Sequence, residues 1–205
     1  MTARIDHAVV AGTFSLDGET FEVENNIWVV GDDRECLVID APHDVDAIMD
    51  VVGDRTVRAI VLTHAHDDHC RVAPALRDRT GAPIWLHPRD QPLWELTHPD
   101  DRWDEDLLDG TELAVGGTTL RALHTPGHTP GATCLHVPDL GCVFTGDTLF
   151  HGGPGATGRS FSDPELIVDS IRARLFTLPP ETIVHTGHGE DTTIGAEHAR
   201  DLGER

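Results

Sequence analysis

Four potential metal ligands stand within six consecutive residues in the first half of the chain. The run from Thr63 onward reads T-H-A-H-D-D-H, so it offers three imidazoles and a carboxylate from His64, His66, Asp68 and His69. These groups suit Zn²⁺, Fe²⁺ or Mn²⁺. Two imidazoles two residues apart can point the same way from extended backbone, whereas Asp68 and His69 are expected to turn at the start of a helix. The run predicts a metal site.

Three further candidate ligands stand alone, each directly after an expected strand. His128 lies in T-P-G-H-T-P-G, Asp147 in T-G-D-T, and His188 in G-H-G. Glycine beside a ligand lets the backbone turn sharply and approach a metal closely. Each motif by itself is a common turn, but their occurrence together at successive strand ends predicts that they belong to the same metal centre.

The elements around these residues must hold them at one edge of the fold. Residues 57–62 are apolar except for Arg58, as is typical of a buried strand, and they lead directly into the His-rich run. Other strands are expected at 8–10, 21–23, 27–30, 36–39, 84–87, 112–115, 118–123, 132–137, 142–145 and 183–185. Helices are expected at 45–52, 72–79, 88–96, 162–176 and 194–202. Two groups of strands, each followed by helices, predict two sheets packed face to face with helices outside.

In this order, the motifs resemble those of the metallo-β-lactamase superfamily, and of its glyoxalase II-like branch in particular. The resemblance covers residues 26 to 198, nearly the whole chain. It implies an α/β fold, a four-layer αββα sandwich of two mixed β-sheets flanked by helices. The length also suits one domain over residues 1–205.

The resemblance distributes the seven candidate ligands between two ions. The first ion is expected at His64, His66 and His128. The second ion is expected at Asp68, His69 and His188. Asp147 is expected to bridge both ions, and Asp68 and Asp147 are the expected catalytic residues. Asp40, in L-V-I-D-A-P, matches a residue that accepts a proton from a ligand imidazole and fixes its orientation.

The resemblance implies two divalent metal ions, zinc first, with iron or manganese as alternatives. Two such ions can share a bridging hydroxide that attacks a carbonyl polarised by one of them. A thiolate leaving group needs little protonation, so a small thioester suits this chemistry. Similarity to glyoxalase II implies hydrolysis of an S-(2-hydroxyacyl) thiol.

Departures from the glyoxalase II pattern leave the thiol carrier open. Glyoxalase II proper has a C-terminal helical domain, whereas this chain ends 17 residues after His188, and Cys70 and Arg71 replace the glycines usual after the His-rich run. In the glycine-rich loop 150–160, His151 and Arg159 are candidates to meet an anionic substrate group, although Arg159 suits a surface ion pair equally well.

Aromatic residues near the expected site have two possible roles. Trp94 and Trp103 are interpreted either as core residues or as a substrate wall. Cys70 is expected to be a packing residue rather than a reactive thiol.

The net charge of the chain disfavours nucleic acids and membranes as partners, so we expect a small-molecule substrate. The chain has 15 basic residues, all arginine, against 36 acidic ones, a net charge of −21. Such a surface repels nucleic acids and anionic membranes. The sequence has no apolar run of about 20 residues that could span a bilayer and no signal-peptide pattern at its start, so we expect a cytoplasmic protein.

Other functions of the same fold remain open. A mononuclear iron persulfide dioxygenase would use His64, His128 and Asp147. A lactonase or β-lactamase is an alternative hydrolase. A metal-stabilised binding module without turnover is an alternative that is not an enzyme. The charge of −21 disfavours a nuclease.

Overall fold

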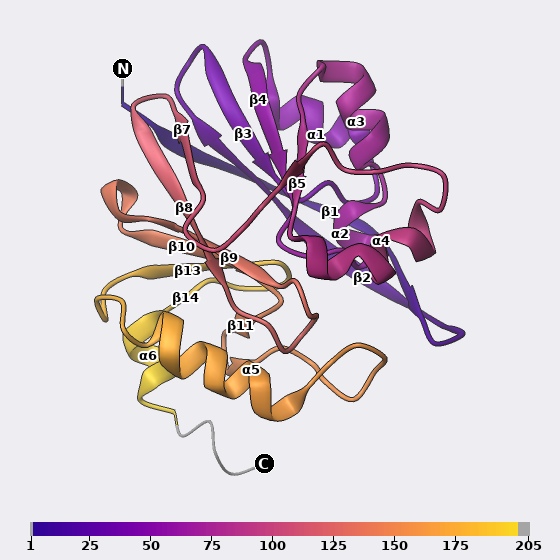
Figure 1. The fold of residues 1–205 in the computed structure, drawn as a ribbon. Coiled ribbons are helices and arrows are strands. Elements are labelled where there is room, and N and C mark those ends of the chain that lie inside the picture. The colour runs from indigo at the N-terminus through magenta and orange to yellow at the C-terminus, as the bar shows by residue number, and fades with distance from the viewer. Residues whose placement is uncertain (1, 201–205) are drawn as a thin grey trace.

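Two six-stranded mixed sheets face each other in the computed structural model, which describes residues 2–200 (Figure 1). The first sheet has the order β1-β2-β3-β4-β5-β6, with antiparallel pairing from β1 to β3 and parallel pairing from β3 to β6. Its strands are β1 (Arg4–Leu16), β2 (Glu19–Gly31), β3 (Glu35–Ile39), β4 (Thr56–Val61), β5 (Ile84–Leu86) and β6 (Glu105–Asp106).

The second sheet has the order β14-β13-β10-β9-β8-β7, and only β10 and β13 are parallel neighbours. Its strands are β7 (Glu112–Val115), β8 (Thr118–His124), β9 (Thr133–Val137), β10 (Cys142–Gly146), β13 (Ile183–Thr186) and β14 (Thr192–Thr193). A separate small hairpin pairs β11 (Leu149–Phe150) with β12 (Gly153–Pro154).

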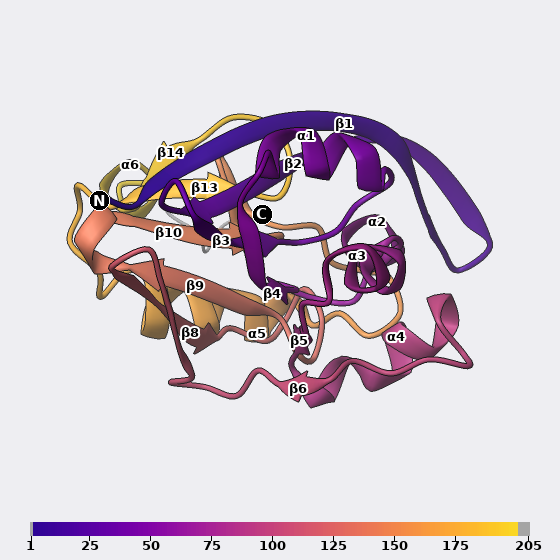
Figure 2. The ribbon, with the colours of Figure 1, turned by 90° about the horizontal axis from the view of Figure 1, so that it is seen from above.

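Helices cover the outer faces of both sheets (Figures 1 and 2). On the first sheet they are α1 (Val45–Val52), α2 (Asp67–Cys70), α3 (Ala73–Thr80), the 3₁₀ turn η1 (Pro88–Asp90) and α4 (Gln91–Thr97). On the second sheet α5 (Pro164–Ser170) continues into a π-helical segment, η3 (Ile171–Leu175), and α6 (Ile194–His198) follows β14; a 3₁₀ turn, η2 (Pro138–Leu140), joins β9 to β10. Residues 201 and 202 of the expected closing helix lie outside the described residues.

Three apolar layers account for this order of sheets and helices. Strand side chains alternate between faces, so Val29 packs under the helices of the first sheet, whereas its neighbour Trp28 packs between the sheets. Phe144 also lies between the sheets, and Val143 packs beneath α5. The predicted four-layer αββα sandwich is therefore confirmed.

The first hairpin differs from the prediction. β1 and β2 are continuous strands of 13 residues each, where three short strands were expected at 8–10, 21–23 and 27–30. A tight turn joins the two strands: Asp17 and Gly18 both have positive φ, 55° and 78°, as a two-residue hairpin turn requires. The strands extend further because the polar residues near the turn face solvent while their backbone completes the ladder.

Two large aromatic residues belong to the core. Trp94 is fully buried and Trp103 is 8% exposed, and both pack in the layer between the first sheet and its helices. The possible substrate-wall role of Trp94 and Trp103 is therefore wrong, because both side chains are buried in this core and neither lines the cavity described below. Among residues 2–200, no helix combines the length and apolar character needed to cross a bilayer.

Candidate metal centre

All seven predicted ligands meet at one edge of the two sheets, on segments that follow strands: Asp68 and His69 lie on α2, as expected, and the others lie on loops. β4 leads into the His-rich run, and the other loops follow β8, β10 and β13. The ligand atoms form three overlapping groups: His64, His66 and His128; His64, His69 and Asp147; Asp68, His69 and His188. Below, the first cluster is His64, His66 and His128, and the second cluster is Asp68, His69 and His188. These two sets coincide with those that the resemblance implies.

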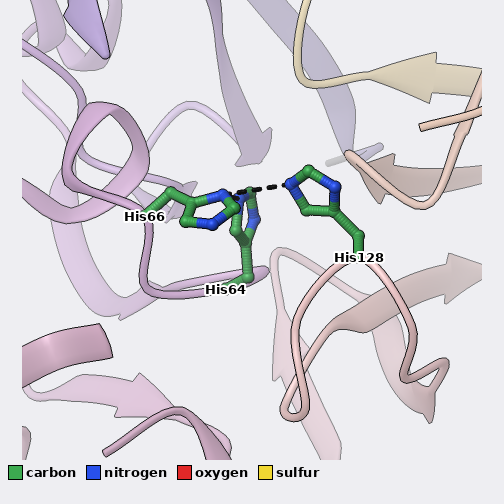
Figure 3. A group of neighbouring side chains, drawn as sticks. All are labelled: His64, His66 and His128. Carbon is green, nitrogen blue, oxygen red and sulfur yellow. Dashed lines mark hydrogen bonds between the residues drawn. The ribbon is translucent and has the colours of Figure 1, made fainter. Parts of the chain in front are cut away.

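The first cluster consists of three buried imidazoles turned toward one another (Figure 3). His66 Nδ1 lies 3.0 Å from His64 Nε2 and 3.0 Å from His128 Nε2. His128 Nδ1 donates to the carbonyl oxygen of Ala156 at 2.9 Å, so its Nε2 presents a lone pair to the cluster. Burial, aided by neighbouring imidazoles, lowers the pKa of His64, and burial lowers that of His66 to about 3. The three rings are therefore neutral.

The second cluster combines a carboxylate with two imidazoles. His69 Nε2 lies 3.1 Å from His188 Nε2 and 3.6 Å from Asp68 Oδ2. His188 Nε2 lies 3.2 Å from Asp68 Oδ2. Burial opposes a proton on His188, but Asp147 and Asp68 outweigh it and raise the pKa of His188 to about 10 in the metal-free chain. Burial also opposes a proton on His69, but the neighbouring carboxylates of Asp147, Asp68 and Asp40 outweigh it and raise the pKa of His69.

Asp147 lies between the two clusters. Its Oδ1 is 3.3 Å from His69 Nε2, and its Oδ2 is 3.5 Å from both His128 Nε2 and His188 Nε2. Oδ1 is buried and has no hydrogen-bond partner within residues 2–200. A buried carboxylate oxygen without a partner is costly unless a cation satisfies it. Converging lone pairs and this oxygen fit divalent metal ions.

Two glycines permit this close approach. A Cβ on Gly187 would stand 2.4 Å from Asp147 Oδ1, and one on Gly146, whose φ is 48°, would stand 2.4 Å from Thr63 Oγ1. Both positions therefore require glycine, which explains why glycine accompanies Asp147 and His188 in the sequence.

Comparison with known proteins identifies the family. The model of the metallo-beta-lactamase superfamily matches residues 21–188, more than half of the chain. The chain belongs to the metallo-β-lactamase superfamily. It is 33% identical to the probable metallo-hydrolase YqgX of Bacillus subtilis, over 85% of this chain and 90% of that one. It is also 33% identical to the hydroxyacylglutathione hydrolase GloC of Haemophilus influenzae, over 83% and 87%.

Solved structures of the superfamily agree. The BLEG-1 B3 metallo-β-lactamase matches with a TM-score of 0.80 at 29% identity, covering 95% of this chain and 100% of that one. TTHA1623 in a di-iron-bound form gives 0.76 at 31%, covering 95% and 98%. ETHE1 from Myxococcus xanthus gives 0.72 at 29%, covering 91% and 80%. With the ligand clusters, these relatives support a metal-dependent hydrolase.

Asp40 orients His69, one of the candidate ligands, as the resemblance implies. Its Oδ2 accepts from His69 Nδ1 at 2.8 Å and from Thr63 Oγ1 at 2.8 Å, and its Oδ1 accepts from Thr63 N at 2.7 Å. The Thr63 hydroxyl thus donates its hydrogen bond to Asp40 and accepts one from His64 Nδ1 at 3.1 Å. This network keeps the protons of His64 and His69 on Nδ1 and turns their Nε2 lone pairs toward the clusters.

Asp90 is a buried residue of the site that the sequence did not reveal. Asp90 Oδ2 accepts from Ala65 N at 3.0 Å and from Thr129 Oγ1 at 2.8 Å, and Oδ1 accepts from Gly131 N. Burial raises the pKa of Asp90 to about 6, although these three donors act to lower it. The side chain joins the loop of His64 and His66 to the loop of His128. In sequence it reads as an ordinary residue at a helix start, so no signal identified it.

A cavity of about 360 Å³ opens above the superfamily site, lined partly by the ligands His66, Asp68, His128, Asp147 and His188. Phe14, Val23 and Ala156 contribute apolar side chains, and among the described lining residues Arg159 is the only basic one other than histidine. The guanidinium of Arg159 lies 4.5 Å from the ring centre of Phe21 and donates to Glu19 Oε2 at 3.0 Å.

Two other residues considered in the sequence, His151 and Cys70, do not line this cavity. The side chain of His151 is 48% exposed, 3.2 Å from Arg200 Nη2 and 3.9 Å from Glu190 Oε2. Cys70 is buried, its Sγ lies 3.6 Å from the carbonyl oxygen of Ala65, and burial raises its pKa. It is a packing residue, as expected.

Proposed function

We propose that the chain is a dinuclear metal-dependent hydrolase that cleaves a small thioester, as the glyoxalase II-like branch of its superfamily does. The observation that carries this proposal is the position of Asp147 between two complete ligand clusters at the base of one cavity. The similarity to a hydroxyacylglutathione hydrolase supports the choice of a thioester.

The residues of the cavity suit a substrate with a good leaving group. When bound, two divalent ions supply an activated water and polarise a carbonyl oxygen. The imidazoles in the lining all belong to the ligand clusters, so none of them is free to protonate a departing group. A thiolate leaves without that help, because thiol pKa values lie near 8.5. The apolar side chains of Phe14, Val23 and Ala156 suit the acyl chain, and Arg159 suits an anionic group of the substrate.

Zinc is the first proposed metal, because the ligands are imidazoles and carboxylates. Iron or manganese suits the same donors. The di-iron form of a relative that is 31% identical supports iron as an alternative.

The experiment that tests this proposal combines metal analysis with a substrate panel. We expect about two ions per chain after purification without chelator, and thiol release from a small thioester at equal rates in air and under nitrogen. A fully active preparation with one ion per chain would refute the dinuclear proposal. Failure of every thioester in the panel would refute the substrate class.

A mononuclear iron persulfide dioxygenase is the second candidate. It would use His64, His128 and Asp147, and His128 Nε2 lies 3.5 Å from Asp147 Oδ2. Oxygen consumption with a persulfide by the iron-loaded protein, without thioester turnover, would favour this candidate. A chromogenic β-lactam and a lactone belong in the same panel, because a B3 metallo-β-lactamase matches over 95% of the chain.

A further inference from the structure

Asn25 is a buried polar residue on β2 that faces the second cluster. It is 1% exposed. Its amide nitrogen, Nδ2, lies 3.0 Å from the backbone oxygen of Asp68 and 3.1 Å from Asp68 Oδ2. The two N–H groups of one amide thus meet two acceptors of one residue. Such a pair of hydrogen bonds fixes the Asp68 carboxylate relative to its own backbone.

The same nitrogen lies over the triangle of the second cluster's ligand atoms. It is 3.4 Å from His69 Nε2 and 3.4 Å from His188 Nε2, and the sides of the triangle measure 3.1, 3.2 and 3.6 Å. An amide nitrogen at these separations covers that triangle without being a ligand itself, because it carries hydrogens and has no lone pair for a cation. The Asn25 amide therefore closes one face of the second cluster.

The orientation of this amide is set by His43. His43 Nε2 lies 2.8 Å from Asn25 Oδ1. Burial lowers the pKa of His43, so the ring is neutral with one proton, and Nδ1 is buried without a hydrogen-bond partner in the described chain. With its proton on Nε2, His43 donates to Oδ1 and leaves Nδ2 facing Asp68. The reverse orientation would bring an amide oxygen within about 3 Å of two oxygens of Asp68, an unfavourable contact.

His43 itself fits only because residue 12 has no side chain. A Cβ on Gly12 would stand 2.1 Å from Cγ of the His43 ring. β1, β2 and the segment before α1 therefore combine to hold one imidazole against one amide.

We propose that Asn25, oriented by His43, is the positioning residue of the second cluster: it holds Asp68 as a ligand and closes the face of the cluster that it covers. An amide nitrogen carries its hydrogens toward Asp68 and has no lone pair for a cation. An ion in this cluster is therefore kept from Asn25 and attracted to Asp147, whose Oδ1 is 3.3 Å from His69 Nε2. This inference rests on the proposed two-ion centre.

The test measures the affinity of each ion separately, by chelator competition and by the visible spectrum of the Co²⁺-loaded protein. Asn25→Leu removes both donors at similar size. His43→Leu keeps Asn25 but removes the donor that orients it, whereas His43→Gln restores an N–H donor. His136→Leu is the control, because His136 is a half-buried histidine on β9 and is not one of the residues that line the cavity.

We expect Asn25→Leu and His43→Leu to weaken binding of the second ion by about 10- to 100-fold, the usual effect of losing a residue that orients a ligand. The first ion should keep its affinity, and the Co²⁺ spectrum of the second site should change. His43→Gln should recover most of the loss, and His136→Leu should match the wild type. The melting temperature in excess chelator reports any general loss of stability.

Three results would overturn the inference. In the first, both leucine variants hold the second ion as tightly as the wild type does. In the second, both ions weaken equally, or His43→Gln is as damaging as His43→Leu, which would indicate a general packing role. In the third, the wild type takes up one ion only; that result alone also refutes the two-ion centre, so the two failures are distinguishable.

Discussion

The two ligand clusters differ in charge, although they share one edge of the fold. The first cluster is three neutral imidazoles, and burial lowers the pKa of His66 to about 3. In the second cluster, carboxylates overcome burial and raise the pKa of His188 to about 10. Without metal, protons can therefore satisfy the second cluster but not the first. We therefore expect metal binding at the second cluster to depend on pH far more than metal binding at the first.

The clusters also differ in the side chains that hold them. Asp90 ties together the loops of the first cluster, whereas Asp40 and Asn25 hold ligands of the second. Asp40 also supports His64 of the first cluster through Thr63, so it serves both clusters. Asp90 and Asn25 contact different clusters, so changes at these two residues should weaken each cluster separately. Within residues 2–200, Asp147 is the carboxylate that lies between both clusters, at 3.5 Å from His128 Nε2 and 3.5 Å from His188 Nε2.

The largest expected effect comes from Asp147→Ala. It removes the one carboxylate that faces both clusters, so both ions should weaken and hydrolysis should fall by more than the roughly 100-fold that loss of an orienting residue costs. Asp68→Ala should remove mainly the second ion. Metal content of the two variants after dialysis is the measurement, and equal losses in both would contradict a bridging role for Asp147.

The second prediction uses pH to separate the clusters. His188 carries a proton below about pH 10 in the metal-free chain, and an ion must displace that proton to bind. Raising the pH from 6 to 8 should therefore tighten the second ion by at least about 100-fold, because each displaced proton contributes tenfold per pH unit and the pKa of His69 is raised as well. The first ion should change far less, because the pKa of His66 is about 3. Metal affinity at each pH is measured by chelator competition. Equal changes in the affinities of both ions would contradict the predicted difference between the clusters.

The fold and the clustering of the candidate ligands could be predicted because their signals are local. Strand ends, glycines and ligand spacing lie within a few residues of each other in the sequence. Asp90 and Asn25 gave no such signal, because their partners Gly131 and Asp68 lie 41 and 43 residues away. The length of the first hairpin was missed for a related reason: its exposed polar residues carry no hydrophobic pattern, and backbone pairing alone extends it.

Asp90→Ala is the third way to test the contrast, and it should affect the first cluster. It leaves the Ala65 and Gly131 amides and the Thr129 hydroxyl without their buried acceptor. Each hydrogen bond to a charged group contributes about 1.5–3 kcal/mol to stability. Loss of a residue that orients a ligand weakens metal binding about 10- to 100-fold. We expect weaker binding of the first ion with the second largely retained, the reverse of Asn25→Leu. Chelator competition on both variants decides it, and a preferential loss of the second ion from Asp90→Ala would contradict the assignment.

Arg159→Met should have the smallest effect, because Arg159 lies on the cavity wall rather than in either cluster. The methionine keeps an apolar stem against Phe21 and removes the charge. A half-exposed ion pair contributes about 1 kcal/mol, so KM for an anionic thioester should rise about fivefold. The value of kcat should stay the same, because the contact binds substrate and transition state alike.

The matched control is Arg102→Met, since the guanidinium of Arg102 also lies over an aromatic ring, 5.3 Å from the centre of Trp103, but is not part of the cavity lining. A neutral thioester of the same shape separates charge from packing. If Arg159→Met raises KM equally for the neutral and the anionic thioester, the side chain acts through its bulk. If only the anionic thioester is affected, its guanidinium binds the anion, and the ion pair with Glu19, whose side chain is 64% exposed, is the contact that the substrate displaces.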